Sequence, residues 1–510
     1  MKVPLTIRDH LERARLVYGE RVACVDEPDQ PAPPLEGLTY GRLYDLAAAQ
    51  AARLDELGVA QGERVAIVSH NAARLLVGFY GVSAWGRVYV PINFRLSADE
   101  ITYIVEHSGA SVLLVDPELD EVLSGVTAKH RFVLGQDDAD LYLAGANPEP
   151  WTPDEDATAT INYTSGTTAR PKGVQMTHRN LWVNAATFGW QSGVNDRDVY
   201  LHTLPMFHCN GWGMPYAVTG MGVRHVVLRK VDGAEILRRV EREGVTLLCG
   251  APAVVAAILD AAATWDGPIP GAGRTRMVVA GAPPPTRTIE RVETELGWEF
   301  IQIYGLTETA PLLTMNRSRA EWDDLTAAER ATRLSRAGTP ALGVTLRVDG
   351  EGEVLARSNV VLEGYWDNPD ASAAALEGGW FHTGDGGLID DGGYLTISDR
   401  KKDVIISGGE NVSSVEVEDC LYQHAAVAEA AVIGVPDPRW GETVKALVVL
   451  RAGASATEAD LIAHCRSHLA HFKCPTSVDV REALPRTATG KLQKFKLREP
   501  FWAGQERRVN

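Results

Sequence analysis

Segments with helical periodicity, each followed by a short apolar run, constrain the fold of this 510-residue chain most. Thr39 is placed to cap a helix with leucines on one face, Gly58 is placed to end it, and Arg64–Val68 (RVAIV) has the pattern of a buried strand. The same order returns where Asp232 precedes ILRRVERE, Gly244 ends that segment and VTLLC follows. This alternation predicts an α/β fold whose parallel sheets are covered by helices on both faces.

The C-terminal part of the chain has a different pattern of shorter units. Ala446–Leu450 has the pattern of a strand, Thr457 is placed to cap a helix that runs to Leu469, and Val478–Glu482 predicts a further strand. These units predict a separate small α+β domain. Upstream of it, the charge-rich residues 316–336 predict a surface excursion with helical content.

Charge and hydropathy exclude several classes of protein. The chain has 50 Lys and Arg against 67 Asp and Glu, and its formal charge of −17 argues against broad electrostatic binding to nucleic acid or anionic lipid. Met1–Leu16 has charges where a signal peptide needs an apolar core, and no run reaches the ~18 apolar residues of a membrane span. We therefore expect a soluble cytoplasmic protein that binds small molecules, with no nucleic acid and no membrane among its partners.

The cysteines show neither a CxxC motif nor a paired Cys/His spacing. We therefore expect neither a zinc site nor a disulfide framework, and we expect most of the thiols to be buried as small apolar side chains. The six residues are Cys24, Cys209, Cys249, Cys420, Cys465 and Cys474.

Residues 163–173, YTSGTTARPKG, carry the strongest chemical signal. They follow a short apolar strand candidate and bring together hydroxyls, a glycine backbone and one lysine, which are the donors that a triphosphate needs. The donors are Thr164, Ser165, Gly166, Thr167, Thr168 and Lys172. Pro171 before the lysine and Gly173 after it exclude a Walker loop, which requires Gly-Lys-Ser/Thr. Taken alone, the segment is also compatible with a polar connecting turn.

Residues 302–309, QIYGLTET, place an aromatic ring beside a carboxylate at a predicted strand-to-loop transition. The ring of Tyr304 suits stacking on a base, and Gly305 and Thr307 lie between it and Glu308. The single carboxylate of Glu308 suits Mg²⁺ whose other ligands are phosphates. Taken alone, Glu308 is equally compatible with the first turn of a helix.

Residues 380–400, WFHTGDGGLIDDGGYLTISDR, predict β-hairpins with Asp385 and Arg400 at their ends. The carboxylate of Asp385 can accept hydrogen bonds from both hydroxyls of a ribose. The alternative is that Asp385, Asp390 and Asp391 are ordinary turn formers.

Residues 484–494, LPRTATGKLQK, form a Pro- and Gly-punctuated segment that presents Lys491 in an otherwise acidic chain. A basic run of this kind, taken alone, is more often a solvated face than a catalytic element.

In this order along the chain, YTSGTTARPKG, YGLTET, TGD (383–385), DRKKD (399–403) and PRTATGK resemble the adenylate-forming superfamily of acyl-CoA synthetases, luciferases and peptide-synthetase adenylation domains. The resemblance spans essentially the whole chain, and five separated motifs in one order leave little room for the separate alternatives above. It implies a large N-terminal domain of two doubly wound α/β lobes plus a β-rich subdomain, and a small mobile C-terminal lid. The family's hinge position selects Lys402, so that residues 1–401 form the AMP-binding domain and 402–510 the lid.

The resemblance also implies roles for individual residues. Tyr304 stacks on adenine, Asp385 and Arg400 hold the ribose, and Thr168 and Glu308 bind Mg²⁺ while the Ser/Thr segment and Lys172 hold the phosphates. The adenine site is lined by Gly281, Ala282 and Pro283, and Gly305 and Thr307 belong to the same nucleotide site.

The reaction that the resemblance implies has two halves. A substrate carboxylate attacks the α-phosphorus of ATP to give an acyl adenylate and pyrophosphate, and the thiol of coenzyme A then displaces AMP. Lys491 is expected to stabilise the first step, with Glu308 acting through Mg²⁺. The lid then turns about Lys402 and presents SGGENVSSVEVE, where Gly408 and Gly409 let the pantetheine arm approach the backbone. Trp440 is a plausible coenzyme A contact, although a buried lid aromatic is nearly as compatible with the sequence.

Residues 204–212, LPMFHCNGW, match the floor of the family's acyl pocket, with His208 at the position of a gate between the acyl and thiol tunnels. Relatives that activate amino acids carry Asp at this position, so His208 would leave a bound ammonium group unpaired. The predicted pocket walls mix large and small residues: Asn210, Trp212, Gly213, Ala251, Val254, Ala280, Gly305 and Ala310. The segments MFHCNGW and SGGENV resemble those of the short- and medium-chain and plant-type acyl-activating CoA ligases. We expect a small or medium carboxylic acid, as in fatty acid metabolism, while a flat aryl acid stays open.

Two other functions are compatible with these motifs. An adenylating enzyme of the same family can load its acid onto a carrier protein or an amine acceptor instead of coenzyme A. A nucleotide-binding sensor without turnover is a further alternative, which the complete set Lys172, Glu308, Asp385, Arg400 and Lys491 argues against. The sequence leaves a homodimer open because no segment identifies an interface.

Overall fold

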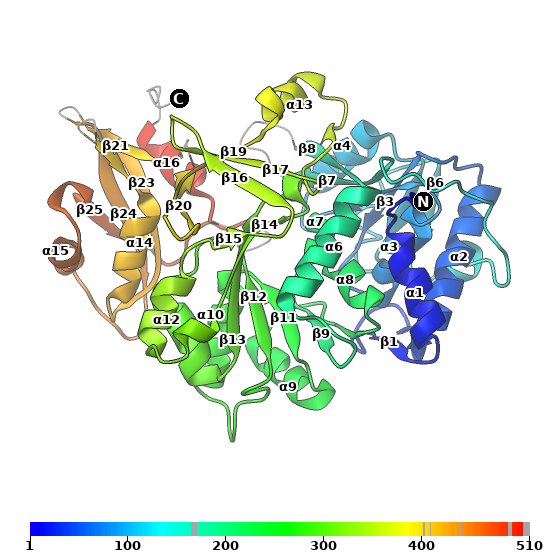
Figure 1. The fold of residues 1–510 in the computed structure, drawn as a ribbon, viewed down its shortest axis with the longest axis horizontal. Coiled ribbons are helices and arrows are strands. Elements are labelled where there is room, and N and C mark those ends of the chain that lie inside the picture. Colours follow the sequence, from blue (N-terminus) through cyan, green and yellow to red (C-terminus); the bar gives the residue numbers. More distant parts are fainter. Residues whose placement is uncertain (165–170, 401–402, 408–409, 438–439, 488–491, 503–510) are drawn as a thin grey trace.

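The computed structural model shows two large α/β lobes side by side, a small β-sheet above their junction and a separate C-terminal unit at one end (Figure 1). It describes residues 1–164, 171–400, 403–407, 410–437, 440–487 and 492–502. Of the helices in those ranges, none combines the length and the apolar character needed to span a membrane.

The first lobe contains a seven-stranded sheet in the order β18-β8-β7-β4-β3-β5-β6. The five strands from β7 to β6 run parallel. β8 pairs antiparallel with β7, and β18 pairs antiparallel with β8 at the edge. The strands are β3 (Arg64–Val68), β4 (Val88–Ile92), β5 (Val112–Val115), β6 (His130–Val133), β7 (Thr158–Thr164), β8 (Lys172–Thr177) and β18 (Gly364–Tyr365). The helices of this region are α2 (Tyr40–Glu56), α3 (Ala73–Ser83), α4 (Ala98–Ser108) and the short α5 (Asp138–Leu141).

The second lobe contains a nine-stranded sheet in the order β15-β14-β13-β12-β11-β9-β10-β1-β2. Its six central strands are parallel, and β2, β14 and β15 are antiparallel. The strands are β1 (Val22–Val25), β2 (Leu38–Thr39), β9 (Val199–His202), β10 (Arg224–Val227), β11 (Leu247–Gly250), β12 (Arg276–Val279), β13 (Glu299–Gly305), β14 (Leu312–Arg317) and β15 (Thr339–Pro340). The helices are α1 (Arg8–Tyr18), α6 (His178–Ser192), α7 (Cys209–Trp212), α8 (Met214–Gly220), α9 (Gly233–Glu243), α10 (Pro252–Ala262), α11 (Thr286–Arg291) and α12 (Ala327–Leu334).

One apolar core joins the two lobes. It includes Leu43 and Phe79 from the helices of the first lobe together with Tyr200 and Ile301 from the strands of the second. Burial of such side chains stabilises the fold by about 1.5–3 kcal/mol each. Because the core is continuous, the two sheets are held in a fixed relation, which a site built from both of them requires.

The capping residues in the sequence predicted the starts of α2 and α9 correctly. The side chain of Thr39 accepts a hydrogen bond from the N–H of Arg42 and caps α2, and that of Asp232 accepts from the N–H of Glu235 and caps α9. Gly244 ends α9 in the left-handed conformation, at φ 69°. The predicted excursion at 316–336 does contain α12, but Trp322 is buried in the core, so this segment is less exposed than its charge indicated.

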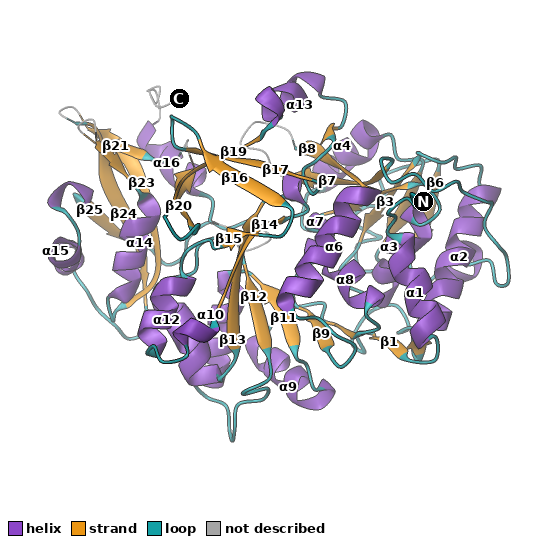
Figure 2. Cartoon of the chain, viewed as in Figure 1, coloured by secondary structure: helices purple, strands orange, loops and turns teal. Residues whose placement is uncertain are grey.

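A four-stranded antiparallel sheet follows, in the order β16-β17-β19-β20 (Figure 2). Its strands are β16 (Val344–Val348), β17 (Glu353–Ser358), β19 (Phe381–Ile389) and β20 (Leu395–Arg400), with α13 (Pro369–Ala375) between β17 and β19 in the chain. Asp390 and Asp391 lie in the turn between β19 and β20, where the carboxylate of Asp390 accepts from the N–H groups of Gly392 and Tyr394. Asp385 instead lies inside β19 and is buried, which excludes the turn-former alternative for it.

The C-terminal unit, called the lid below, has its own sheet and its own apolar core. Its strands are β21 (Ile405–Ser407), β22 (Glu410–Val412), β23 (Val427–Asp437), β24 (Gly441–Leu450) and β25 (Ser477–Val480), and its helices are α14 (Ser414–Gln423), α15 (Glu458–His468) and α16 (Lys494–Trp502). The final predicted strand is shorter than expected, since β25 ends at Val480. The predicted boundary at Lys402 lies outside the described residues, between the end of β20 and the start of β21.

The lid touches the second lobe through α14. The carboxylate of Asp419 accepts hydrogen bonds from the backbone N–H of Thr286 at 3.0 Å and from its hydroxyl at 3.3 Å, at the start of α11. The hydroxyl of Ser413 donates to the carbonyl oxygen of Ser398 in β20.

Candidate active site

Four adjacent parallel strands of the nine-stranded sheet end at one edge, and predicted site residues follow each of them. These strands are β9, β11, β12 and β13. Residues 204–212 come after β9, 251–254 after β11 and 280–283 after β12, while Tyr304 lies near the end of β13, two places beyond the partner of Val279. The sheet therefore gathers the predicted acyl residues Ala251, Val254 and Ala280 and the predicted adenine residues Gly281, Ala282 and Pro283 at its carboxyl edge. Open α/β sheets bind ligands at this edge.

The segment after β9 is held by the buried side chain of Asn71, which follows β3 of the other sheet. The amide of Asn71 donates to the carbonyl oxygens of His202 and Leu204, both at 3.0 Å, and its oxygen accepts from the N–H of Met206 at 2.8 Å. Sequence reasoning missed Asn71, because its hydrogen-bond partners lie far away in the chain and no neighbouring residue indicates them. The carboxyl ends of both sheets therefore meet here.

Aromatic packing joins the two sheets at the same place. The ring of Phe94, after β4, meets the ring of Phe207 edge to face with centres 5.5 Å apart, and the ring of His70 lies 3.8 Å from that of Phe94. Because His208 directly follows Phe207, the predicted gate residue is anchored by this contact. His208 itself is half-buried and starts the turn that follows.

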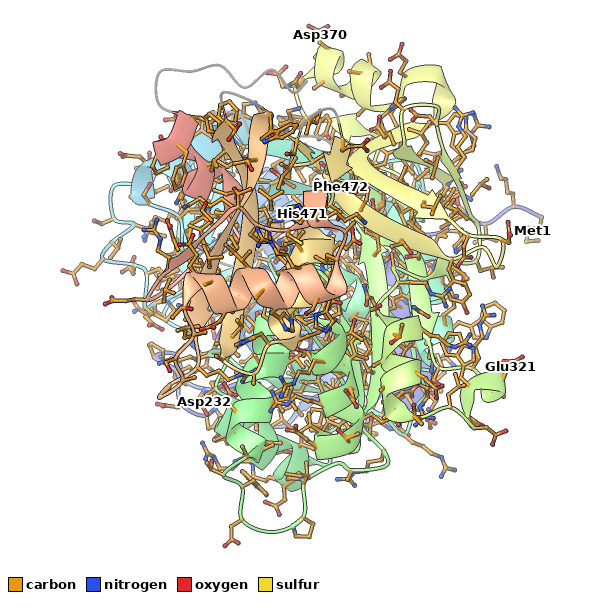
Figure 3. All side chains as sticks on the ribbon, turned by 90° about the vertical axis from the view of Figure 1, so that its left-hand side faces the viewer. Met1, Asp232, Glu321, Asp370, His471 and Phe472 are labelled. Carbon is orange, nitrogen blue, oxygen red and sulfur yellow. The ribbon has the colours of Figure 1, made fainter. Side chains whose placement is uncertain are left out.

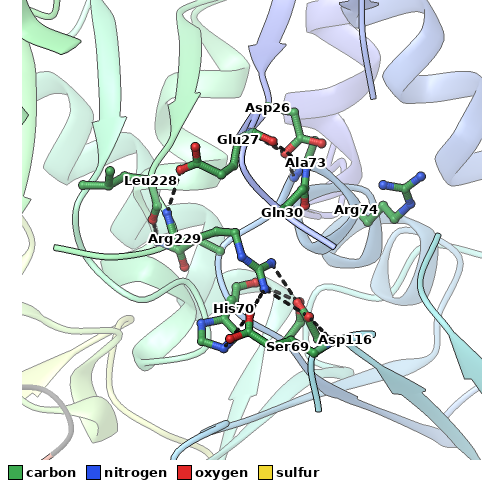
Figure 4. A network of polar contacts seen from close by, with 12 residues as sticks. Asp26, Glu27, Gln30, Ser69, His70, Ala73, Arg74, Asp116, Leu228 and Arg229 are labelled. Carbon is green, nitrogen blue, oxygen red and sulfur yellow. Dashed lines mark hydrogen bonds and ion pairs between the residues drawn. The ribbon is translucent and has the colours of Figure 1, made fainter. Parts of the chain in front are cut away.

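Beside this edge, buried ion pairs connect the lobes (Figure 4). Arg229 after β10 pairs with Asp116 after β5 at 2.9 Å, and the two side chains are only 8% and 2% exposed. The hydroxyl of Ser69 donates to the same carboxylate at 2.9 Å, and the N–H of Arg229 donates to Glu27 at 3.2 Å. Burial by itself raises the pKa of Asp116, but the hydrogen bond and the charge of Arg229 outweigh it and hold that pKa below its ordinary value.

The predicted acyl floor contains a left-handed turn. Five consecutive residues, Cys209 to Gly213, have φ between 47° and 73°, and three of them are not glycine. Left-handed non-glycine residues cost about 1–2 kcal/mol each, so the surroundings must hold them. Asn210 is 1% exposed, and its amide donates to the side-chain oxygens of Thr160 and Asn162, both at 3.0 Å. The structure thus shows Asn210 supporting the turn, while its predicted contact with the acid stays a prediction.

Asn184 of α6 ties this turn to the start of β14, just beyond the YGLTET segment. Its amide donates to the carbonyl oxygen of Trp212 at 3.1 Å, and its oxygen accepts from the N–H of Leu312 at 3.2 Å. A Cβ on Gly213 would lie 2.3 Å from the amide nitrogen of Asn184, so a larger residue would displace this support. Asn184 is fully buried and was also missed by sequence reasoning.

YGLTET forms the end of β13 and a single 3-10 turn, Thr307–Thr309, so the strand-to-loop prediction is confirmed. Glu308 lies in that turn, so the position that the helix-start alternative gave it is also correct. A Cβ on Gly305 would lie 1.5 Å from the carbonyl oxygen of Pro311, so only glycine fits there. Ala310, the last predicted acyl residue, has φ 68° and is 1% exposed.

Tyr304 and Asp385, predicted to bind adenine and ribose, are brought together by two different sheets. The hydroxyl of Tyr304 donates to the carboxylate of Asp385 at 2.8 Å. Asp385 also pairs across the β19–β20 hairpin with Arg400, the other predicted ribose residue. An aromatic face, a carboxylate and the backbone of an arginine therefore meet at one place.

Glu308 and Lys172 lie on either side of one tyrosine. The hydroxyl of Tyr365 in β18 donates to Oε1 of Glu308 at 3.0 Å, and Nζ of Lys172 lies 4.8 Å from the centre of the Tyr365 ring. Burial and the Glu308 carboxylate raise the pKa of the Tyr365 hydroxyl, which therefore remains a donor. Sequence reasoning missed Tyr365, because its position beside Lys172 follows from the pairing of β18 with β8, two strands that lie far apart in the chain.

Cys209 brings the acyl floor against the predicted metal ligand. Burial and the nearby Glu308 carboxylate raise the pKa of its thiol, and the side chain of Thr307 acts in the opposite direction. The turn that carries His208 and the turn that carries Glu308 are therefore neighbours, as a reaction between a carboxylic acid and a nucleotide phosphate requires.

Several predicted residues lie outside the described part of the chain: Ser165, Gly166, Thr167, Thr168, Lys402, Gly408, Gly409 and Lys491. Thr164 is described and pairs with Lys172 across the β7–β8 hairpin. Trp440 is 46% exposed, so the alternative of a buried lid aromatic is wrong. All six cysteines are buried free thiols, as expected.

Two family models match the chain. The model described as AMP-binding enzyme matches residues 11–366, and the model described as AMP-binding enzyme C-terminal domain matches residues 416–491. The chain belongs to the AMP-binding enzyme family. The resemblance stated from the motifs is thereby confirmed, together with the α/β fold of a large N-terminal and a small C-terminal domain.

Members of the AMP-binding enzyme family match the chain over nearly its whole length. The 2-methylpropanoate–CoA ligase of Humulus lupulus is 35% identical, with 97% of this chain and 95% of the relative covered. A 4-hydroxybutyrate–CoA ligase of Metallosphaera sedula is 36% identical, with 96% and 93% covered. Among solved structures, an anthranilate CoA ligase in complex with anthranoyl-AMP has a TM-score of 0.86 at 27% identity, with 98% of this chain and 99% of that chain covered.

The described side chains fit the nucleotide of an AMP-binding enzyme. A carboxylate beside a tyrosine ring suits a nucleoside, and a carboxylate beside a lysine suits a phosphate chain with its cation. Glu308 offers a single carboxylate oriented by the Tyr365 hydroxyl, which is an oxygen donor of the kind Mg²⁺ prefers.

Proposed function

We propose that this protein is an AMP-forming acyl-CoA synthetase that activates a small or medium carboxylic acid with ATP and transfers the acyl group to coenzyme A. The observation that carries the proposal is the meeting of Tyr304 with Asp385 and of Glu308 with Tyr365 and Lys172 beside one left-handed turn. Relatives that match nearly the whole chain and are named as CoA ligases for 2-methylpropanoate and 4-hydroxybutyrate support it.

In this proposal the nucleotide lies across the carboxyl edge of the nine-stranded sheet. Adenine stacks on Tyr304 beside Gly281, Ala282 and Pro283, and the ribose hydroxyls bond to Asp385, displacing the bond that the Tyr304 hydroxyl makes with it. Gly305 and Thr307 border the same site. Arg400, opposite Asp385 in the hairpin, is the second ribose residue.

The phosphates lie between Lys172 and the segment 164–168. Glu308 and Thr168 would hold Mg²⁺, which supplies positive charge to the phosphate oxygens when bound. Lys172 offers a further cation, and Tyr365 keeps the Glu308 carboxylate aimed at this place.

The lid supplies the remaining groups. Lys491 stabilises charge where the carboxylate oxygen approaches the α-phosphorus, and such a group accounts for about 3–4 kcal/mol, as one oxyanion-hole donor does. The lid then pivots at Lys402, so that Gly408, Gly409 and the exposed Trp440 approach coenzyme A. The proposed domains are residues 1–401 and 402–510.

The acid lies on the floor after β9. His208 separates the acid from the thiol path, and Trp212, Gly213, Ala251, Val254, Ala280, Gly305 and Ala310 form the walls, with Asn210 beneath them. No carboxylate of the described floor stands ready to pair with an α-ammonium group next to Phe207, which favours acids without that group.

The test is mass-spectrometric detection of CoA thioesters after incubation with ATP, Mg²⁺, coenzyme A and a panel of acids. The panel holds 2-methylpropanoate, butyrate, 4-hydroxybutyrate, hexanoate, octanoate, palmitate, benzoate and cinnamate. We expect prompt thioester formation from a small or medium aliphatic acid. Pyrophosphate and AMP without any thioester would instead assign a carrier protein or an amine as the acceptor, and no turnover of ATP with any acid would refute the proposal.

A further inference from the structure

Three potential metal ligands meet in the lid, between α14 and α15. Sγ of Cys420 and one ring nitrogen each of His464 and His468 all lie within 4.8 Å of one another. Cys420 lies on α14, and the two histidines are four residues apart on α15, so they share a face of that helix. Both helices pack on the lid core, which fixes their relation. The chain spacing did not reveal this trio because Cys420 lies 44 residues before His464.

Hydrogen bonds already orient both imidazole rings. Nε2 of His464 donates to the carbonyl oxygen of Cys420 at 2.9 Å, and Nδ1 of His468 donates to the carbonyl oxygen of His464 at 2.8 Å. Nδ1 of His468 also lies 2.9 Å from the hydroxyl oxygen of Ser467. Histidines that bind metals ordinarily donate their other N–H to a backbone carbonyl or a similar acceptor, and both rings have such an acceptor here.

The solvent exposure of the three side chains increases from Cys420 to His468. Cys420 is 3% exposed, His464 is half-buried and His468 is exposed at the end of α15. A cation at this place would therefore be held by sulfur from within the lid and would keep one position open to water.

We propose that Cys420, His464 and His468 form a binding site for Zn²⁺ or another divalent cation of the same borderline-soft class. One thiolate and two imidazoles are ligands that zinc prefers, whereas Mg²⁺ prefers oxygen. Binding releases the Cys420 thiol proton to solvent and forms one bond to sulfur and two to nitrogen, with water as the fourth ligand.

The geometry requires only a small adjustment. Zinc–sulfur and zinc–nitrogen bonds of about 2.3 and 2.0–2.1 Å place tetrahedral ligand atoms about 3.4–3.6 Å apart. The three ligand atoms must therefore approach one another by roughly 1 Å, and rotation of the exposed His468 side chain can supply this movement. The bound cation would join α14 to α15, and α14 is the helix whose Asp419 contacts the second lobe.

The experiment uses the full-length protein without an affinity tag, freed of metal by chelation. Zn²⁺ is titrated in competition with a chromogenic chelator, and Co²⁺ is used as a spectroscopic probe. We expect one equivalent of Zn²⁺ per chain and, with Co²⁺, a thiolate-to-metal charge-transfer band.

Matched variants separate this site from adventitious binding. Cys420→Ser should abolish the charge-transfer band, and His468→Ala should weaken Zn²⁺ binding by at least about tenfold. His471→Ala is the control, because His471 is an exposed lid histidine outside the trio (Figure 3). It should leave binding unchanged.

The proposal is overturned if Co²⁺ gives no thiolate band, or if His468→Ala binds Zn²⁺ as tightly as the wild type and the His471→Ala control do. Should Cys420→Ser fail to fold, the exposed His468→Ala variant and the band of the wild-type protein still decide the question. Activity of the enzyme is not needed for either readout, so failure here is distinct from failure of the proposed CoA ligase function.

Discussion

Replacing Tyr365 by phenylalanine removes one hydroxyl group and tests how the Glu308 carboxylate is positioned. The hydroxyl donates to Oε1 of Glu308 at 3.0 Å, and the ring that remains still lies under Nζ of Lys172 at 4.8 Å. The substitution therefore removes the hold on Glu308 while it leaves the contact of Lys172.

The magnitude follows from the type of bond that is lost. A hydrogen bond to a charged group contributes about 1.5–3 kcal/mol. Each ~1.4 kcal/mol changes a rate tenfold. We expect Tyr365→Phe to slow adenylate formation by about 10- to 100-fold and to raise the Mg²⁺ concentration needed for half-maximal rate, because the carboxylate is no longer aimed.

The assay measures the two half-reactions separately. Pyrophosphate release reports adenylate formation across a Mg²⁺ titration, and thioester formation from supplied acyl adenylate reports the second step. The second step should change little, since the nucleotide phosphates that Glu308 serves have left as pyrophosphate. Tyr40→Phe is the matched control, because the Tyr40 hydroxyl donates to the carbonyl oxygen of Val223 in the buried core, far from these residues in the chain.

The reasoning would be refuted by a Tyr365→Phe enzyme whose adenylation rate and Mg²⁺ dependence stay within about twofold of the wild type. Equal loss in both half-reactions would also count against it, because that result indicates a general disturbance of the fold. Tyr40→Phe should lower the thermal midpoint slightly and leave both rates unchanged, since it costs about 1 kcal/mol of stability.

Other substitutions test the lid and the lobe junction. Lys491→Ala should reduce adenylate formation by at least ~10² and spare thioester formation from supplied adenylate; equal loss in both would contradict its assignment to the first step. Lys402→Pro fixes φ near −65° and should suppress whichever half-reaction needs lid rotation, so unchanged rates in both would exclude Lys402 as the pivot. The pKa of Asp116 is held below its ordinary 3.8, so its pair with Arg229 stabilises the fold above that pH and the contribution is lost as the pH falls through the lowered value. Asp116→Asn should lower the free energy of unfolding at pH 7 by about 3 kcal/mol, and its unfolding midpoint should fall less steeply than the wild type's as the pH is lowered. A variant whose midpoint has the same acid pH dependence as the wild type's would contradict this role.

The parts of the fold that the sequence predicted are those with local causes. Thr39 and Asp232 each cap a helix by accepting a hydrogen bond from the backbone N–H three residues later, and Gly244 ends α9 in the left-handed conformation. A few adjacent residues therefore decide each of these helix boundaries. The motif residues Tyr304, Glu308 and Asp385 were selected from residue type and order; the structure brings Tyr304 to Asp385, and the roles of all three stay predictions.

The buried asparagines that hold the candidate site in place are not marked by their neighbours in the sequence, and sequence reasoning missed them. Asn71 and Asn184 bind backbone groups more than 20 positions away, and their burial follows only from how the lobes pack. The left-handed turn contains Gly211 and Gly213, but its non-glycine residues Asn210 and Trp212 are held by partners in β7 and α6. For the lid trio, the pair His464 and His468 at helical spacing was the one signal available.

Sheet pairing explains how the described groups that we propose to bind phosphate are brought together. Thr164 and Lys172 pair across the β7–β8 hairpin. β18 adds to the same hairpin, with Tyr365 opposite Val174, and this brings the Tyr365 ring to Lys172 and its hydroxyl to Glu308. Groups positioned by strands need no reordering when a nucleotide binds, which preserves binding energy for the reacting atoms. In the proposed two-step reaction only one further group then has to arrive and leave, and this is the role proposed for Lys491 of the lid.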